Sequence, residues 1–255
     1  MTNESDALLI AGATKALRIP GVGSNFRELE TKASAGNWGY LRYLAELLAI
    51  ELDDRDMRKA KRLLGASRVP RTKLLSDFDL DASLVTRDVV EYLGKGEFIG
   101  SSKSVVLIGG PGTGKTHLLI GTLIAGASLG KRTRYVNAAA LVNELVEAED
   151  EKSLSRVIER YQRLDLLGID ELGYLHLDRR GAELLFQVIT EREERSALIV
   201  ATNLPFSEWN EIFPDPRLAS AVVDRITFNS RIIETGSDSF RLRSALTSKA
   251  EKTRS

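Results

Sequence analysis

The run of residues 109–116 has the composition and spacing of a phosphate-binding loop. It reads Gly-Gly-Pro-Gly-Thr-Gly-Lys-Thr, follows the apolar run Val105–Ile108 and precedes an apolar helical pattern. In such a loop the backbone N–H groups surround the phosphates, the lysine reaches the β- and γ-phosphates, and the threonine hydroxyl ligates Mg²⁺. The sequence therefore predicts a site for a nucleoside triphosphate and Mg²⁺, formed by Gly109, Gly110, Pro111, Gly112, Thr113, Gly114, Lys115 and Thr116.

A pair of acids follows a second apolar run. Asp170 and Glu171 come directly after residues 166–169, Leu-Leu-Gly-Ile, downstream of the loop. In a Walker B element the aspartate holds Mg²⁺ through water, and the glutamate orients and deprotonates the water that attacks the γ-phosphate. The pair therefore favours hydrolysis over binding alone, and the alternative is a strand that ends in solvated acids. Gly168 replaces a bulky strand residue, which predicts a close backbone approach.

Polar residues after the apolar run 199–201 supply further candidates. We expect Asn203 to hydrogen-bond the attacking water or the γ-phosphate, and the alternative is that it caps a turn before Pro205. Arg225 is the first choice for an arginine finger that completes the site of a neighbouring subunit, and its alternative role is an internal ion pair through Asp224. The other arginines considered for the finger are Arg217, Arg231 and Arg241.

The N-terminal part of the chain reads as helical. Apolar residues recur at helical spacing between residues 40 and 52, which predicts a small all-α domain over residues 1–75. Aromatic residues interleave with Arg42 at its centre, and they are expected to pack in a core; the alternative is that they stack on nucleic-acid bases. These aromatic residues are Trp38, Tyr40 and Tyr43.

The remainder of the chain has a different pattern. From about residue 80, helical segments alternate with short β-rich runs, which predicts an α/β domain with a parallel sheet over residues 76–245. Strands of such a sheet are buried on both faces and should be almost continuously apolar, as residues 105–108 and 198–201 are. A polar tail, residues 246–255, follows and is expected to be partly disordered.

Composition excludes several classes of protein. The 255 residues include no cysteine and two histidines, so a disulfide framework, a thiolate zinc site and a redox role are not expected. No apolar stretch reaches the roughly 20 residues that span a bilayer, and the apolar N-terminal segment follows acids where a signal peptide has positive charge. We therefore expect a cytoplasmic protein without a membrane segment.

The charges balance overall but are unevenly distributed. The chain carries 36 basic and 36 acidic residues, yet residues 55–73 contain eight basic residues and one acid. Such a block is typical of a surface that neutralises nucleic-acid phosphates, and the alternative is a solvated helix face. The candidate DNA-binding residues are Arg55, Arg58, Lys59, Lys61, Arg62, Arg68, Arg71 and Lys73.

Taken together, the motifs resemble the IstB family of helper ATPases in insertion-sequence transposition, which are related to the DnaC helicase loaders. The resemblance rests on residues 109–118, 170–175, 184–186, 201–209, 224–226 and 236–241, the last close to the family's Gly-x-Ser-Tyr-Arg pattern. The resemblance extends the nucleotide-binding motif by one residue, to His117. It implies an AAA+ P-loop NTPase domain with five parallel strands in the order 5-1-4-3-2, ATP as the nucleotide, ATP-dependent self-assembly on duplex DNA, and delivery of that DNA to a partner transposase.

Two other functions compete with this interpretation. A DnaC-like replicative helicase loader shares the ATPase fold but would use the N-terminal helices to grip a helicase. A small-molecule kinase shares the loop but needs a lid and acceptor-binding arginines, whereas the acidic pair and Asn203 suit water as the acceptor.

Overall fold

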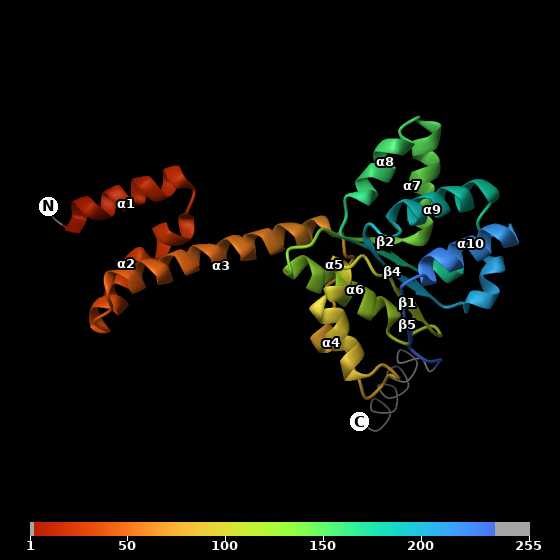
Figure 1. Cartoon of the computed structure of the whole chain (residues 1–255), viewed down its shortest axis with the longest axis horizontal. Helices are drawn as coiled ribbons and strands as arrows, with labels where there is room; N and C mark the ends of the chain where they lie inside the picture. The colour runs from red at the N-terminus through yellow and green to blue at the C-terminus, as the bar shows by residue number, and fades with distance from the viewer. Residues whose placement is uncertain (1–2, 238–255) are drawn as a thin grey trace, which may run out of the picture. The chain divides into compact units, whose positions relative to one another are not determined.

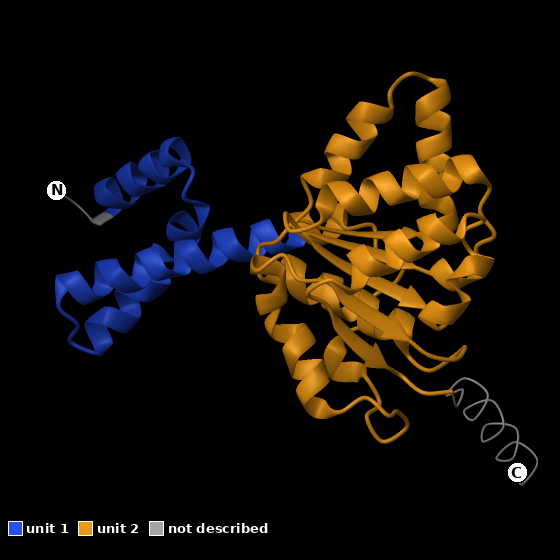
Figure 2. Cartoon of the chain, turned by 45° about the vertical axis from the view of Figure 1, so that its right-hand side comes forward, with its two compact units in different colours: residues 1–61 blue, residues 62–255 orange. Residues whose placement is uncertain are grey.

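The computed structural model describes residues 3–237, and the chain forms two compact units, Met1–Lys61 and Arg62–Ser255 (Figure 2). The predicted polar tail, the predicted domain end at residue 245 and Arg241 of the Gly-x-Ser-Tyr-Arg-like pattern lie outside the described residues. Three helices begin the chain: α1 (Asn3–Leu17), α2 (Pro20–Ala35) and α3 (Tyr40–Ala66). The N-terminal unit is therefore helical, as the spacing of its apolar residues predicts.

The N-terminal unit has a small core of its own. Its buried members are Ala7, Val22, Phe26, Leu29 and Leu47, and Trp38 and Tyr43 pack against them as predicted. The prediction was wrong for Tyr40, the first residue of α3, whose side chain is 94% exposed. Four leucines along α3 are also 48–86% exposed, and together with Tyr40 they form a surface that we call the apolar stripe: Leu41, Leu44, Leu48 and Leu52.

Glu51 fixes the start of α2 from within this unit. Its Oε2 accepts the backbone N–H of Gly21 at 2.7 Å and that of Val22 at 3.4 Å, so it caps two of the free donors at the helix start. Pro20, the first residue of α2, has a fixed φ that suits the start of a helix, and it has no backbone N–H that would need an acceptor.

The second unit begins within α3. Leu64 and Val69 pack against the buried residues of this unit, which explains why the unit starts at residue 62. The sequence-based division between residues 75 and 76 stays a prediction. Residues 67–74, which we call the basic linker, lead from α3 to a short 3-10 helix, η1 (Leu75–Asp77).

Five parallel strands form the sheet of the second unit, in the order β2-β3-β4-β1-β5. The order confirms the 5-1-4-3-2 arrangement implied by the family resemblance, and it is that of an AAA+ P-loop domain. The strands are β1 (Val105–Ile108), β2 (Thr133–Asn137), β3 (Leu166–Asp170), β4 (Ala197–Thr202) and β5 (Arg231–Glu234), and the two apolar runs expected to be strands, 105–108 and 198–201, lie in β1 and β4.

Helices cover both faces of this sheet (Figure 1). Alternate strand residues face a layer made of α4 (Arg87–Lys95), α5 (Glu97–Gly100) and α6 (Lys115–Ser128). The other strand residues face a layer made of α7 (Ala138–Asp150), α8 (Leu154–Gln162), α9 (Arg179–Arg192), η3 (Phe206–Glu211) and α10 (Pro216–Thr227). Within residues 3–237, no helix combines the length and the hydrophobicity that crossing a membrane requires.

Gly168 allows α6 to lie close to β3. A Cβ at this position would come within 2.8 Å of Leu123 and 3.0 Å of Leu119, both on α6. The close approach predicted from the glycine is thus confirmed. It places the helix that follows the phosphate-binding loop directly against the strand that carries the two acids.

Candidate nucleotide site and basic linker

The predicted site residues meet at the carboxyl edge of the sheet. Strand register places Ile108 opposite Thr202, and Asn137 opposite Asp170, so the strands end at the same level. The loop after β1, the acids after β3 and Asn203 after β4 therefore lie at one edge, as expected for a ligand site in a parallel α/β sheet.

The phosphate-binding loop is anchored to the end of β5. The N–H of Gly110 donates to the Gly236 carbonyl at 2.8 Å, and the hydroxyls of Thr113 and Thr235 lie 2.6 Å apart. Gly112 and Gly114 have positive φ of 79° and 96°, which favours glycine at both positions. The Lys115 ammonium donates to the carbonyls of Gly109 and Gly110 at 2.7 Å each, so its charge lies over the loop.

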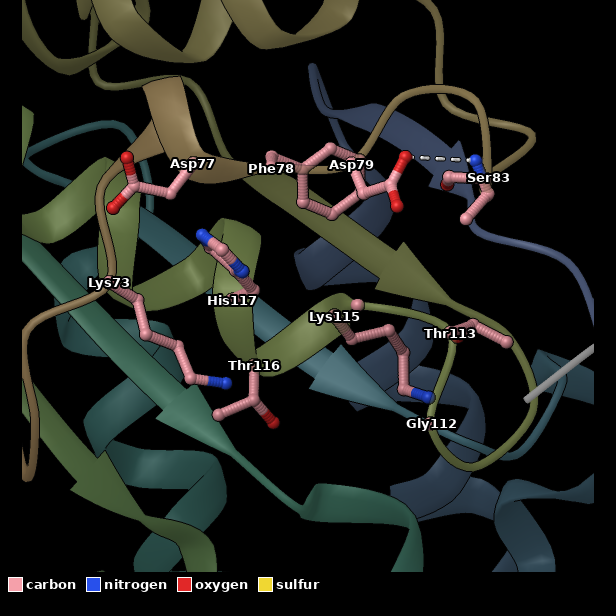
Figure 3. Close-up of a pocket in the computed structure, with 12 residues that line it drawn as sticks. Lys73, Asp77, Phe78, Asp79, Ser83, Gly112, Thr113, Lys115, Thr116 and His117 are labelled. Atoms are coloured by element: carbon pink, nitrogen blue, oxygen red, sulfur yellow. Dashed lines mark hydrogen bonds between the residues drawn. The ribbon is translucent and has the colours of Figure 1, made fainter. Parts of the chain in front are cut away.

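A pocket of about 260 Å³ lies between this loop and the chain segment that precedes α4 (Figure 3). Phe78 contributes its ring, which leaves no room for a side chain on Gly114. His117 packs edge-on against Phe78, with ring centroids 5.4 Å apart, and its Nε2 lies 2.7 Å from the Leu74 carbonyl. His117 thus lines the pocket and also fastens the basic linker to α6.

Asp170 lies beside the predicted magnesium ligand Thr116. The Thr116 hydroxyl donates to Asp170 Oδ1 at 3.3 Å, and the Glu171 N–H donates to the same oxygen at 3.0 Å. The phenol of Tyr135 donates to Oδ2 at 3.1 Å. Burial raises the pKa of Asp170, which is 2% exposed, and the three hydrogen bonds counteract part of this effect. A cation next to this carboxylate would compensate its burial.

Thr116 and Asp170 suit Mg²⁺ shared with a nucleotide better than they suit a metal ion whose ligands all come from the protein. Within residues 3–237, no group of three or more His, Cys, Asp or Glu side chains could hold a metal ion. Mg²⁺ in nucleotide sites is bound through one or two protein oxygens together with phosphates and waters. The hydroxyl of Thr116 and Oδ1 of Asp170 supply two oxygens in the required place.

Glu171 is held by the neighbouring edge strand. The side-chain amide of Asn137 donates to Glu171 Oε2 at 2.5 Å, and Glu171 itself has a left-handed backbone, with φ of 63°. Asn137 also caps α7, since its Oδ1 accepts the Ala139 N–H at 3.0 Å. One asparagine therefore ties the candidate catalytic base to the start of a helix.

Asn203 faces the turn after β3. Its Oδ1 is buried and accepts no hydrogen bond from any residue in the range 3–237. The turn before Pro205 is capped by Thr202 instead, whose Oγ1 accepts the Leu204 N–H at 3.1 Å. The alternative role for Asn203, capping this turn, is thus taken by its neighbour, and its contact with water or phosphate stays a prediction.

Arg225 lies away from the phosphate-binding loop of its own subunit. It lines a pocket together with Ser104, which directly precedes β1, and Ser196, which directly precedes β4, at the amino ends of the strands. Its Nε is 3.2 Å from Glu193 Oε2, and its guanidinium lies 4.7 Å from the centroid of the Phe186 ring. The internal ion pair suggested by the sequence exists, but its partner is Glu193.

The basic block is divided between two environments. In the N-terminal unit, Arg55 and Arg58 pair with Glu51 at 3.0 and 3.1 Å, while their own side chains stay about half exposed. In the second unit, Lys73 lines the nucleotide pocket, where it points toward Thr116 (Figure 3). The other members are exposed and form no ion pair within the described part of the chain: Lys59, Lys61, Arg62, Arg68 and Arg71.

Sequence reasoning missed two residues of the site, Tyr135 and Asn137. Both lie on β2, where their side chains reach the acids of β3. A partial signal was present: Thr133, Tyr135 and Asn137 occupy alternate positions of β2, although Arg134 between them is also polar. Period-two spacing puts such residues on one face. Their contact with the acids depends on the β2–β3 register, which the spacing does not give.

Comparisons with known proteins find relatives among the ATP-binding proteins of insertion sequences. The chain is 34% identical over 229 residues to the insertion sequence IS5376 ATP-binding protein of Geobacillus stearothermophilus, an alignment that covers 89% of this chain and 91% of that protein. It is 30% identical over 228 residues to the insertion sequence IS21 ATP-binding protein of Pseudomonas aeruginosa, covering 89% and 86%.

Solved structures resemble the fold. DnaA from Aquifex aeolicus bound to AMPPCP aligns with a TM-score of 0.52 and 22% identity over 63% of this chain. DnaI aligns with a TM-score of 0.50 and 19% identity, covering 68% of this chain and 89% of DnaI. This chain spans about half of the aligned DnaA chain, 48%. The family described as IstB-like ATP binding protein matches residues 12–248. The chain therefore belongs to the family of IstB-like ATP binding proteins.

Proposed function

We propose that this protein is a cytoplasmic AAA+ ATPase that binds ATP and Mg²⁺, assembles on duplex DNA and delivers that DNA to a partner transposase. Hydrolysis rests on one observation: Glu171 directly follows the carboxylate next to Thr116, at the sheet edge where the phosphate-binding loop lies. Bound Mg²⁺ would neutralise charge on the β- and γ-phosphates. Lys115 would bind the same phosphates, and Glu171 would accept a proton from the attacking water. The names of the relatives, which are ATP-binding proteins of insertion sequences, support the role in transposition.

Two surfaces support assembly on DNA. The exposed cations of the basic linker and of α3 suit contacts with phosphates, which would bind DNA with little sequence preference. The apolar stripe of α3 consists of five large apolar side chains that are 48–94% exposed, and we assign it to contact with a second copy of this chain.

Arg225 is proposed to act on a neighbouring subunit. At the amino ends of the strands it lies at the opposite edge from its own phosphate-binding loop. A site completed by an arginine from the next protomer would make hydrolysis depend on assembly.

The experiment combines DNA binding with particle size. Random-sequence duplex DNA is titrated with the protein in ATP, ADP or no nucleotide while light scattering is recorded. We expect a large complex that needs ATP and whose affinity falls steeply with salt. A DNA affinity that changes neither with ATP nor with salt concentration would contradict the proposal. Absence of DNA binding, with retention of a hexameric helicase from cell extract, would favour the helicase-loader function.

Variants localise the DNA-binding surface. Arg62→Gln, Arg68→Gln and Arg71→Gln together should weaken binding and reduce the salt slope by about 0.9 for each phosphate that the variant no longer neutralises. A control with the same change in net charge replaces three other exposed arginines with glutamine. These are Arg163, Arg179 and Arg195, and each pairs with a glutamate four residues away in the sequence. Equally weakened binding in both triple variants would move the DNA site away from the linker.

A further inference from the structure

Tyr135 contacts Asp170, the carboxylate proposed to hold Mg²⁺, but it has no part in the roles proposed above. It lies on the edge strand β2, opposite Gly168 of β3, and its ring packs against the buried side chains beneath α6. Its phenol donates to Asp170 Oδ2 at 3.1 Å. The other oxygen, Oδ1, is the one that lies by Thr116. The phenol thus fixes the rotation of the carboxylate that leaves Oδ1 on the metal side.

The backbone of the same residue holds the basic linker. The Tyr135 N–H donates to the Ser67 carbonyl at 2.7 Å, on the side of β2 that faces away from β3. On the same strand, Arg134 Nη1 lies 3.5 Å from the Ala66 carbonyl. Tyr135 therefore binds the linker through its main chain and the metal ligand through its side chain.

The far end of the linker is also attached to the nucleotide site. The Leu74 carbonyl lies 2.7 Å from Nε2 of His117, the residue that follows Thr116. Lys73 points toward Thr116 from the linker (Figure 3). Both ends of residues 67–74 are thus held by residues next to, or bonded to, the two magnesium ligands.

Electrostatics agree with this proximity. Burial raises the pKa of the Tyr135 phenol, and the carboxylates of Asp170 and Glu171 raise it further, so it stays a proton donor. Arg71 of the linker is close enough to oppose the shift.

We propose that Tyr135 is a positioning residue that orients Asp170 for Mg²⁺ and couples the occupancy of the basic linker by DNA to metal and nucleotide binding. The coupling rests on the function proposed above, in which the linker contacts DNA phosphates. Because coupling between two ligands is reciprocal, DNA should tighten nucleotide binding by the factor with which nucleotide tightens DNA binding.

The test deletes one oxygen atom. Tyr135→Phe keeps the ring and the backbone N–H, and so removes only the bond to Asp170. The matched control is Tyr161→Phe, which deletes a phenol that donates to Glu144 at 2.5 Å in the α7–α8 layer, outside the nucleotide pocket. Binding of a fluorescent non-hydrolysable ATP analogue to the full chain is measured against Mg²⁺ concentration, with and without random-sequence duplex DNA.

In Tyr135→Phe, the Mg²⁺ concentration for half-maximal binding should rise about tenfold, because outer-shell partners of metal ligands typically contribute that much. Binding without Mg²⁺ should be unchanged, and the enhancement by DNA should fall close to one. Tyr161→Phe should match the wild type in all three. Wild-type Mg²⁺ dependence or wild-type enhancement in Tyr135→Phe would overturn the inference. Failure of the wild-type protein to bind DNA or nucleotide would instead refute the proposed function.

Discussion

The amide of Asn137 and the carboxylate of Glu171 are joined by a hydrogen bond of 2.5 Å, from the end of β2 to the residue after β3. While this bond holds, the Glu171 carboxylate is directed toward Asn137, and it must give up the bond before it can turn to an attacking water. Hydrogen bonds to charged groups contribute about 1.5–3 kcal/mol. The hydrogen bond from Asn137 of β2 therefore lowers the availability of Glu171, the candidate base, for its reaction.

We expect Asn137→Ala to raise the basal rate of ATP hydrolysis by about tenfold, since about 1.4 kcal/mol corresponds to that factor. The same variant removes the cap of α7 and should lower stability by about 1 kcal/mol. Asp178→Ala is the control, because Asp178 caps α9 by accepting the Gly181 N–H at 2.8 Å. It should lose similar stability with an unchanged rate. A slower Asn137→Ala enzyme would mean that the amide positions the base for catalysis.

Lys115 and Glu171 should separate binding from hydrolysis. Lys115→Ala should abolish nucleotide binding, because it removes the cation over the phosphate-binding loop. Glu171→Gln should bind ATP normally and accumulate as a DNA-bound assembly, because the base is absent while the groups that bind the phosphates remain. Calorimetric titration with nucleotide and light scattering on DNA measure the two effects. Equally impaired nucleotide binding in both variants would contradict the roles assigned.

Gly168 tests the packing that places α6 on β3. Gly168→Ala should destabilise the second unit by about 1–3 kcal/mol, since its methyl group would press on Leu119 and Leu123. Gly65→Ala, in α3 with open space around it, should instead stabilise by about 0.5–1 kcal/mol. Urea unfolding of the two variants gives the comparison. An unchanged free energy of unfolding in Gly168→Ala would show that α6 can shift without loss of stability.

The N-terminal unit should be acid-sensitive through Glu51. Burial raises the pKa of this carboxyl, but hydrogen bonds from Arg55, the N–H groups of Gly21 and Val22, and Arg58 outweigh it and leave the pKa below its ordinary value of 4.5. Its stabilising contribution is thus complete above pH 4.5 and is lost as the pH falls through the lowered value. The melting temperature of the wild type should drop in that range, while Glu51→Gln should melt lower at neutral pH and depend less on acid.

An exposed glutamate of the same helix provides the control for that experiment. Glu46→Gln should melt like the wild type at both pH values, since Glu46 is exposed and forms no ion pair with a described residue. A wild-type acid response in Glu51→Gln would assign the sensitivity to other carboxyls.

The apolar stripe should be required for assembly but not for folding. Leu44→Lys with Leu48→Lys places charges on side chains that are 51% and 48% exposed, so the helical signal should persist while the ATP-dependent particle on DNA is lost. Leu129→Lys, at a site 51% exposed in the second unit, should still assemble. Normal assembly of the double variant would exclude the stripe as the interface between copies.

The sheet was predictable because its strands are short, continuously apolar and separated by helical patterns, as residues 105–108 and 197–201 illustrate. The phosphate-binding loop and the acids were predictable because each is contiguous in sequence. Interactions that depend on strand register or on helix packing were not. Tyr135 and Asn137 reach the acids across β2 and β3, and Arg225 of α10 meets Glu193, the residue that follows α9. Tyr40 has the right spacing for a core but, as the first residue of α3, is left exposed, which the spacing alone does not reveal.

The bond between Ser67 and Tyr135 has a further consequence, for how this protein avoids uncontrolled aggregation. β2 lies at an edge of the sheet, where free backbone N–H and C=O groups can pair with a strand of another molecule. The linker occupies that edge by accepting the Tyr135 N–H, and it brings the positive charges of Arg68 and Arg71 alongside. The proposed contact between copies of this chain can therefore form through side-chain surfaces, because the linker covers the backbone of β2 at Tyr135 and opposes a continuous intermolecular sheet there.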